Sequence, residues 1–154
     1  MHGLLFAKSL WRFRRSAGQH PRCFMGLRLA RAMKAMIMAG GFGTRLRPLT
    51  INTPKPMVPM MNKPMMHHIV TLLKNHGISD LISTLFYSPE AVTTYFGDGS
   101  QLGVKMSYMK ADADYGTAGS VRNATKGMNE RIMVISGDVL TDFNLTDAIK
   151  FHES

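Results

Sequence analysis

Residues 35–50, with the sequence AMIMAGGFGTRLRPLT, carry the strongest structural signal of the chain. The segment opens with five apolar residues, Ala35 to Ala39, which stop at a pair of glycines. A short, continuous apolar run is typical of a strand that is buried on both faces of a parallel sheet. The sequence therefore predicts a central strand over 35–39 that leads directly into a glycine-rich loop.

Short apolar runs and longer helical patterns alternate along the rest of the chain. Pro64 and Ser88 mark helix starts, and Gly77 marks a helix end. This alternation predicts an α/β fold, with a mostly parallel sheet and helices on both of its faces. The loops 40–49 and 137–139 both follow strands, so we expect them at the same edge of the sheet. The other predicted strands cover 81–86, 104–108 and 132–135, and the predicted helices cover 64–77, 88–96, 117–126 and a last one from Asn144 or Thr146 to the chain end.

The positive charge is concentrated at the N-terminus. The 154 residues include 19 Lys and Arg against 10 Asp and Glu, a formal charge of +9. Seven of the basic residues lie within residues 1–32, which contain no acidic residue. The other 122 residues are nearly neutral, which argues against a protein that binds nucleic acid or a membrane. No apolar run reaches the roughly 18–20 residues that a membrane-spanning helix needs.

The segment 1–32 allows three interpretations. Its Arg-rich, acid-free composition resembles an organellar transit peptide. Because Met33 is followed at once by the first strand, the segment also reads as an extension upstream of the true start. The third interpretation is a basic arm for RNA or lipid headgroups, since Trp11 and Phe13 lie between its charges. In each case residues 1–32 are a basic N-terminal extension, and the domain begins at residue 33.

The single cysteine, Cys23, belongs to the same extension. One cysteine excludes a disulfide within the chain and a cysteine-based metal site in the domain. No feature of the sequence requires an oxidising compartment, and we expect a cytoplasmic protein.

The glycine-rich loop has the chemistry of an anion site. Gly40, Gly41 and Gly43 let backbone N–H groups approach an anion closely, and Arg45 and Arg47 suit bidentate pairing with phosphate oxygens. The loop is not a Walker loop, because Gly-Lys-Ser/Thr is missing. It is not the dinucleotide fingerprint either, because a leucine stands where the third glycine is needed. A plain tight turn would not explain the arginines.

The motif AGGFGTRLRPLT, followed by TPKPMVP, resembles the signature of the sugar-1-phosphate nucleotidyltransferases. The similarity continues in order through NKPMMHHIVTLLKNHGISD, FGDGSQLGVKMSY, YGTAGSVRNA and VISGDVLTDFNL, and covers essentially all of residues 33–152. The segments PKPMVP, GTAGSV and SGDVLTDFNL look most like bacterial mannose-1-phosphate guanylyltransferases in which this domain precedes a phosphomannomutase-like domain. The resemblance implies a Rossmann-like fold. It also implies transfer from an NTP to a sugar 1-phosphate, giving an NDP-sugar and pyrophosphate, with GDP-mannose from GTP and mannose 1-phosphate favoured.

The same resemblance assigns roles to individual residues. Arg45 would hold the pyrophosphate leaving group and Lys55 would reach the phosphates, so both are expected to be catalytic. Asp138, which follows a predicted buried strand and a glycine, corresponds to a ligand of Mg²⁺. The expected nucleotide-binding residues are Ala39, Gly40, Gly41, Gly43, Thr44, Gly116 and Thr117.

Members of this family continue well past the Gly-Asp pair and use their second half for the sugar pocket. Residues 33–154 are therefore expected to be a truncated nucleotidyltransferase domain with little activity alone. The expected partners are an NTP, with GTP favoured, and a sugar 1-phosphate; a homo-oligomer is left open. One alternative is a glucose-1-phosphate uridylyl-, thymidylyl- or adenylyltransferase. Another is a non-catalytic nucleotide-binding module.

Overall fold

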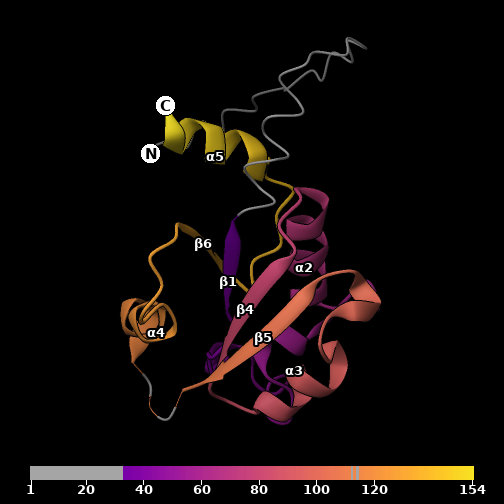
Figure 1. The fold of residues 1–154 in the computed structure, drawn as a ribbon. Coiled ribbons are helices and arrows are strands. Elements are labelled where there is room, and N and C mark those ends of the chain that lie inside the picture. The colour runs from indigo at the N-terminus through magenta and orange to yellow at the C-terminus, as the bar shows by residue number, and fades with distance from the viewer. Residues whose placement is uncertain (1–32, 112, 114) are drawn as a thin grey trace, which may run out of the picture.

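The computed structural model describes residues 33–111, 113 and 115–154, so the predicted extension 1–32 lies outside the described residues. A four-stranded sheet forms the centre, in the order β5-β4-β1-β6, and every neighbouring pair is parallel (Figure 1). The predicted parallel sheet is confirmed, and the strand ends differ from the predicted ones by at most two residues. The strands are β1 (Lys34–Met38), β4 (Asp80–Leu85), β5 (Lys105–Lys110) and β6 (Ile132–Ser136).

Helices cover both faces of this sheet, as expected. Figure 1 shows α2 and α3 on one side and α4 on the other. Within the described part of the chain, the helices are α2 (Met65–Asn75), α3 (Pro89–Phe96), α4 (Gly116–Ala124) and α5 (Leu145–Glu153), and the short 3-10 turns are η1 (Thr44–Leu46), η2 (Lys55–Met57) and η3 (Ser100–Leu102).

The main core lies between the sheet and α2. Ala35 and Ile37 of β1 point to this face, and both are fully buried. The buried residues of α2 recur at i, i+3, i+4 and i+7, which places them on one stripe of the helix. These residues are Met66, Ile69, Val70 and Leu73. On the opposite face, Met36 is buried while Val134, beside it in β6, is 39% exposed.

Gly77 ends α2 as predicted. It has φ +81°, its N–H donates to the carbonyl of Lys74 and the N–H of Ile78 donates to that of Leu73. This pair of bonds is a Schellman motif, in which glycine takes the left-handed position at no steric cost. Ile78 is fully buried beside the helix end.

Two local features differ from the sequence predictions. Ser88 precedes α3, but its side chain makes no capping hydrogen bond, because its φ of +46° departs from the extended conformation of a capping residue. A small antiparallel hairpin, β2 (Pro59–Met60) with β3 (Lys63–Pro64), was not expected. Its turn places Met61 and Asn62 at φ +50° and +64°.

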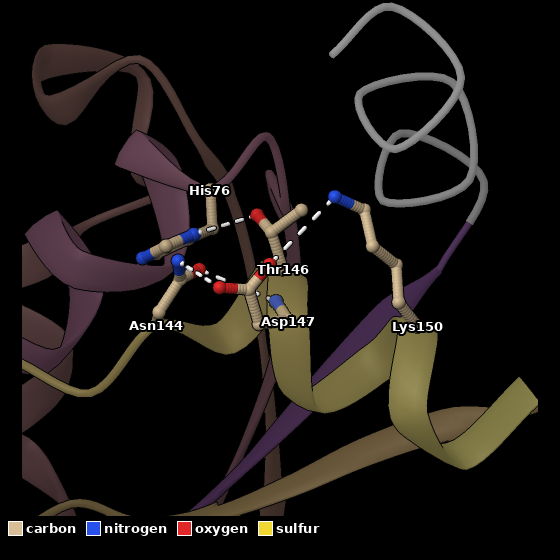
Figure 2. A network of polar contacts seen from close by, with 5 residues as sticks. All are labelled: His76, Asn144, Thr146, Asp147 and Lys150. Carbon is tan, nitrogen blue, oxygen red and sulfur yellow. Dashed lines mark hydrogen bonds and ion pairs between the residues drawn. The ribbon is translucent and has the colours of Figure 1, made fainter. Parts of the chain in front are cut away.

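The last helix, α5, is capped and anchored by side chains. Asn144 is its capping residue, and its side-chain Oδ1 accepts a hydrogen bond from the backbone N–H of Asp147 at 3.3 Å. His76, at the end of α2, lies 2.8 Å from the hydroxyl of Thr146, which joins the two helices (Figure 2). Of the two predicted caps, Asn144 is therefore the one used. No helix within the described ranges is long and apolar enough to cross a membrane.

The strand order places a ligand crevice. The chain runs from β1 outward through β4 to β5, and it then returns to the other side of β1 as β6. In open α/β sheets, ligands bind beyond the carboxyl ends of strands at such a change of direction. The loops after β1 and β6 leave the sheet at this point.

Candidate functional site

A pocket of about 260 Å³ lies at the carboxyl edge of the sheet, as the strand order predicts. Its walls come from the loop after β1, from η2, from the ends of β4 and β6, from the segment after β5 and from the first turns of α4. The lining residues are Met38, Ala39, Gly40, Gly41, Phe42, Lys55, Pro56, Thr84, Leu85, Phe86, Ala111, Ala113, Gly116, Thr117, Ser120, Ser136 and Asp138. The expectation that loops 40–49 and 137–139 share one edge is confirmed.

The loop after β1 offers backbone donors. Ala39 is still tied to the sheet, since its N–H donates to the carbonyl of Thr84 at 3.0 Å. The next four N–H groups, from Gly40 to Gly43, donate no hydrogen bond to a described residue. A row of unpaired N–H groups beside a pocket forms an anion-binding concavity.

The glycines of this loop serve different purposes. A Cβ on Gly40 would lie 3.3 Å from the Cβ of Phe86, so the loop passes close to the end of β4. Gly43 has φ +63°, which favours glycine, whereas a Cβ on Gly41 would meet no heavy atom within 4 Å. Gly41 is also exposed, which leaves its backbone open to a ligand.

Lys55 and Asp138 face each other across the pocket. Lys55 Nζ lies 2.5 Å from Asp138 Oδ2, and the Ser136 hydroxyl donates to the other carboxylate oxygen. Partial burial alone would raise the pKa of Asp138. The hydrogen bonds from Lys55 and Ser136 and the charge of Lys55 outweigh it, so the pKa lies below its ordinary value.

The backbone explains how these two side chains meet. Pro54 and Pro56 are buried on either side of Lys55, so the short turn η2 is held firmly in place. At β6, the N–H of Gly137 donates to the carbonyl of Met38 at 2.9 Å, which continues the sheet up to Asp138. Asp138 therefore projects from the end of a strand that is paired with β1.

Most of the predicted site residues come together here, but three do not line the pocket. Gly43, Thr44 and Arg45 lie further along the loop, at and within η1. Arg45 is exposed, and its guanidinium forms no hydrogen bond or ion pair with any residue that the structure describes. The residues that do line the pocket are Ala39, Gly40, Gly41, Lys55, Gly116, Thr117 and Asp138.

Comparison with known families agrees with this geometry. Residues 34–154 match the family described as Nucleotidyl transferase. The chain belongs to the nucleotidyltransferase family. This match covers nearly every described residue, from the start of β1 to the end of α5.

Individual relatives of this nucleotidyltransferase chain differ in substrate. The mannose-1-phosphate guanylyltransferase of Mycobacterium tuberculosis is 40% identical over 121 residues, which are 78% of this chain and 34% of that protein. The UTP–glucose-1-phosphate uridylyltransferase of a Synechocystis species is 36% identical over 132 residues, again 78% of this chain and 34% of the relative. The chain thus spans about a third of the length of these curated relatives.

A solved structure supports the fold as well as the family. A proposed glucose-1-phosphate thymidylyltransferase from Bacillus anthracis, crystallised with sucrose, superimposes with a TM-score of 0.73 at 30% identity. The match covers 79% of this chain and 50% of that one. The Rossmann-like, mostly parallel architecture that the sequence predicts is therefore confirmed.

Several residues of the nucleotidyltransferase pocket were not predicted from the sequence. Phe42 and Phe86 form an edge-to-face pair with ring centroids 5.3 Å apart, and Ser136 binds the Asp138 carboxylate. Ser120 lines the pocket one turn into α4. Phe86 and Ser136 could have been found, because both stand at carboxyl ends of predicted strands.

The pocket suits a metal ion that is held mainly by the phosphates of a bound substrate and only in part by the protein. Asp138 is the one acidic side chain among the described residues that line it. No cluster of three or more His, Cys, Asp or Glu side chains that could hold a metal occurs within 33–111, 113 and 115–154. Mg²⁺ commonly binds through one or two carboxylates together with substrate phosphates, so a single Asp fits a Mg²⁺–nucleotide.

Proposed function

We propose that this chain binds an NTP for nucleotidyl transfer to a sugar 1-phosphate, with GTP and mannose 1-phosphate as the favoured pair. The products are GDP-mannose and pyrophosphate. The observation that supports the proposal best is the pocket itself, where the N–H groups of Gly40, Gly41 and Phe42, which donate no hydrogen bond to a described residue, lie beside one lysine and one aspartate. The reaction brings two polyanions together. N–H donors and a cationic side chain stabilise this concentration of negative charge.

The proposed step is an in-line displacement. A phosphate oxygen of the sugar 1-phosphate attacks the α-phosphorus and forms a new P–O bond. The bond from the α-phosphorus to the bridging oxygen breaks, and its electron pair leaves with pyrophosphate. Arg45, which has no acidic partner among the described residues, is free to stabilise that charge, and Lys55 neutralises the phosphates.

The Lys55–Asp138 pair would exchange partners when a nucleotide binds. Each charge satisfies the other until a phosphate takes over the lysine. The released Asp138 carboxylate is then available to hold Mg²⁺, which when bound supplies charge neutralisation for the phosphates. Ser136 donates a hydrogen bond to the same carboxylate and helps to orient it.

The substrate pair has a second candidate. Similarity to the Synechocystis uridylyltransferase and to the Bacillus structure favours UTP or dTTP with glucose 1-phosphate as the alternative. The two candidates share the phosphate chemistry above and differ only in base and sugar. Pyrophosphate release by this chain, measured with each substrate pair, distinguishes them.

Calorimetric titration of the 154-residue chain with GTP tests the binding proposal. Lys55→Gln should weaken GTP binding roughly 10- to 100-fold, because a charge-assisted contact to phosphate is lost. Lys105→Gln is the control, since Lys105 is exposed at the opposite, amino end of its strand. Equal affinity of wild type and Lys55→Gln would contradict the proposal.

Asp138→Asn gives a result of opposite sign in the same titration. Without Mg²⁺, the variant should bind GTP more tightly than wild type, because Lys55 no longer has a competing anion. With Mg²⁺, the wild type should gain affinity and the variant should not. A variant that responds to Mg²⁺ as the wild type does would remove Asp138 from the proposed metal site.

A further inference from the structure

The buried hydroxyl of Thr50 forms a hydrogen bond with the backbone of the glycine-rich loop. Thr50 is only 1% exposed, and its hydroxyl donates to the carbonyl oxygen of Gly43 at 2.7 Å. The same carbonyl accepts the N–H of Leu46 at 2.9 Å. Thr50 does not line the pocket, so this contact acts on the loop and not on a ligand.

The segment between these two residues is a chain of tight turns. Leu46 donates its N–H to Gly43, and Leu49 donates its own to Leu46, both at 2.9 Å. The turns bring the chain back on itself until the Thr50 side chain reaches Gly43. Arg45 lies inside this closed segment, so its backbone position depends on the closure.

Packing ties the closure to the neighbouring lysine. A Cβ placed on Gly43 would lie 3.0 Å from Thr50 Cγ2 and 3.0 Å from Lys55 Cβ. The backbone of Gly43 is therefore in close contact with both side chains. A displacement of Thr50 would be transmitted to the loop and to the Lys55 segment together.

The direction of the Gly43 carbonyl is what makes the hydroxyl important. A carbonyl oxygen turned towards the pocket would repel a phosphate, whereas the N–H groups from Gly40 to Gly43 would attract one. Because Thr50 is buried, the carbonyl that it binds points into the protein. The loop can then present its donors without a competing acceptor.

We propose that Thr50 is a positioning residue of the nucleotide-binding loop. Its hydroxyl holds the Gly43 carbonyl inward, which keeps the loop N–H groups and Arg45 in place for phosphate. The proposal rests on the proposed function, because it assumes that this loop receives the phosphates of an NTP.

Two matched pairs of variants isolate the hydroxyl. Thr50→Val keeps the shape of the wild-type side chain and removes the hydroxyl. Thr50→Ser and Thr50→Ala lack the same methyl group and differ from each other only in the hydroxyl. Should Thr50→Val not fold, the Ser and Ala pair still decides the question.

The readouts are affinity for GTP and for pyrophosphate, and amide hydrogen exchange of residues 41–49. Loss of the hydroxyl should weaken both affinities about three- to tenfold in Thr50→Val and Thr50→Ala, with Thr50→Ser within about twofold of wild type. Amide exchange of residues 41–49 should be faster only in Thr50→Val and Thr50→Ala, and exchange of residues 105–110 should stay unchanged in all variants. A merely structural role would lower the free energy of unfolding without this difference in affinity and loop exchange between the variants. Thr50→Ser would then not restore the affinity or the exchange that Thr50→Ala loses.

The outcomes separate this proposal from the proposed function. If the wild-type chain binds neither GTP nor pyrophosphate, the proposed function fails, and loop exchange alone decides whether Thr50 positions the loop. Equal loop exchange in wild type and the three Thr50 variants would overturn the role of Thr50. Equal affinity of Thr50→Val, Thr50→Ala and wild type would overturn it as well. A loss of affinity in Thr50→Ser equal to that in Thr50→Ala also overturns the role of Thr50.

Discussion

Gly43 and Gly41 stand two positions apart in one loop but should tolerate an added methyl group very differently. Gly43 has φ +63°, and its Cβ would lie 3.0 Å from two side chains. We expect Gly43→Ala to lower the free energy of unfolding by about 1–3 kcal/mol, through strain and crowding. Gly41→Ala is the control, because its Cβ would meet nothing within 4 Å. Urea unfolding measures both, and equal stability of the two variants would contradict this account of the loop.

His67 should make stability depend on pH in mildly acidic solution. Burial lowers the pKa of His67, and the charges of Lys63 and His68 lower it further. As the pH falls through the ordinary histidine range, the unfolded chain therefore takes up a proton before the folded chain does. Stability should fall until the pH passes below the lowered pKa of the folded state, and then stop responding to this group.

Urea unfolding between pH 7 and pH 5 measures this contribution. His67→Gln should lose part of the decline that the wild type shows, while His152→Gln serves as the control because His152 is exposed on α5. A decline of the same size in wild type and His67→Gln would show that the histidine does not titrate as described.

Pairing between Lys55 and Asp138 shows the limit of sequence reasoning at single residues. Strand positions predicted that Asp138 would reach the edge where the glycine loop lies, and the structure places it there. The sequence could not show that Lys55 would be its partner, because the turns from Thr44 to Met57 set the lysine's direction. Periodicity carries no information on such irregular backbone.

Among the elements, α5 depends most visibly on side-chain contacts at one end. Asn144 accepts the N–H of Asp147, and its amide also donates to that carboxylate at 2.7 Å (Figure 2). Removal of a capping side chain typically costs about 1 kcal/mol, so Asn144→Ala should lower the free energy of unfolding by that amount. Asn129→Ala is the control, because Asn129 is exposed and outside any helix or strand.

Urea unfolding again provides the measurement, with circular dichroism as the signal. A loss in Asn144→Ala no larger than that in Asn129→Ala would mean that the last helix is held by its buried face alone. Leu145 and Ile149 provide that face.

Strands and helices with a clear periodic pattern were predictable, and the irregular elements were not. The stripe on α2 and the apolar run of β1 both derive from residue spacing, so their type and place followed directly. The β2–β3 hairpin was missed because its turn uses Met61 in a left-handed conformation without a glycine. Ser88 was expected to cap α3, but the helix begins at Pro89 without a hydrogen bond from the Ser88 side chain.

At the scale of the whole molecule, charge and ligand binding should be separable. Residues 1–32 hold seven of the 19 basic residues and no acid, whereas the predicted site lies entirely within 33–154. Deletion of residues 1–32 should therefore leave GTP affinity within about twofold of the full chain, because every described residue that lines the pocket is kept. Binding to heparin should become weaker and lose most of its salt dependence. A large loss of GTP affinity on deletion would assign the extension to the site.

The strand order also sets the sequence in which the site can come into being during folding. β1 precedes the other strands that the structure describes, yet one of its two neighbours is β6, and the ion pair from Lys34 to Glu130 beside them spans 96 residues. Contacts so distant in sequence form late, because a long loop must be closed before they contribute. The glycine loop follows β1 and Asp138 follows β6, so the pocket of a nascent chain is incomplete until β6 pairs with β1. Nucleotide therefore cannot act as a template for the early folding of this chain, because it can stabilise the pocket only after β6 has paired with β1.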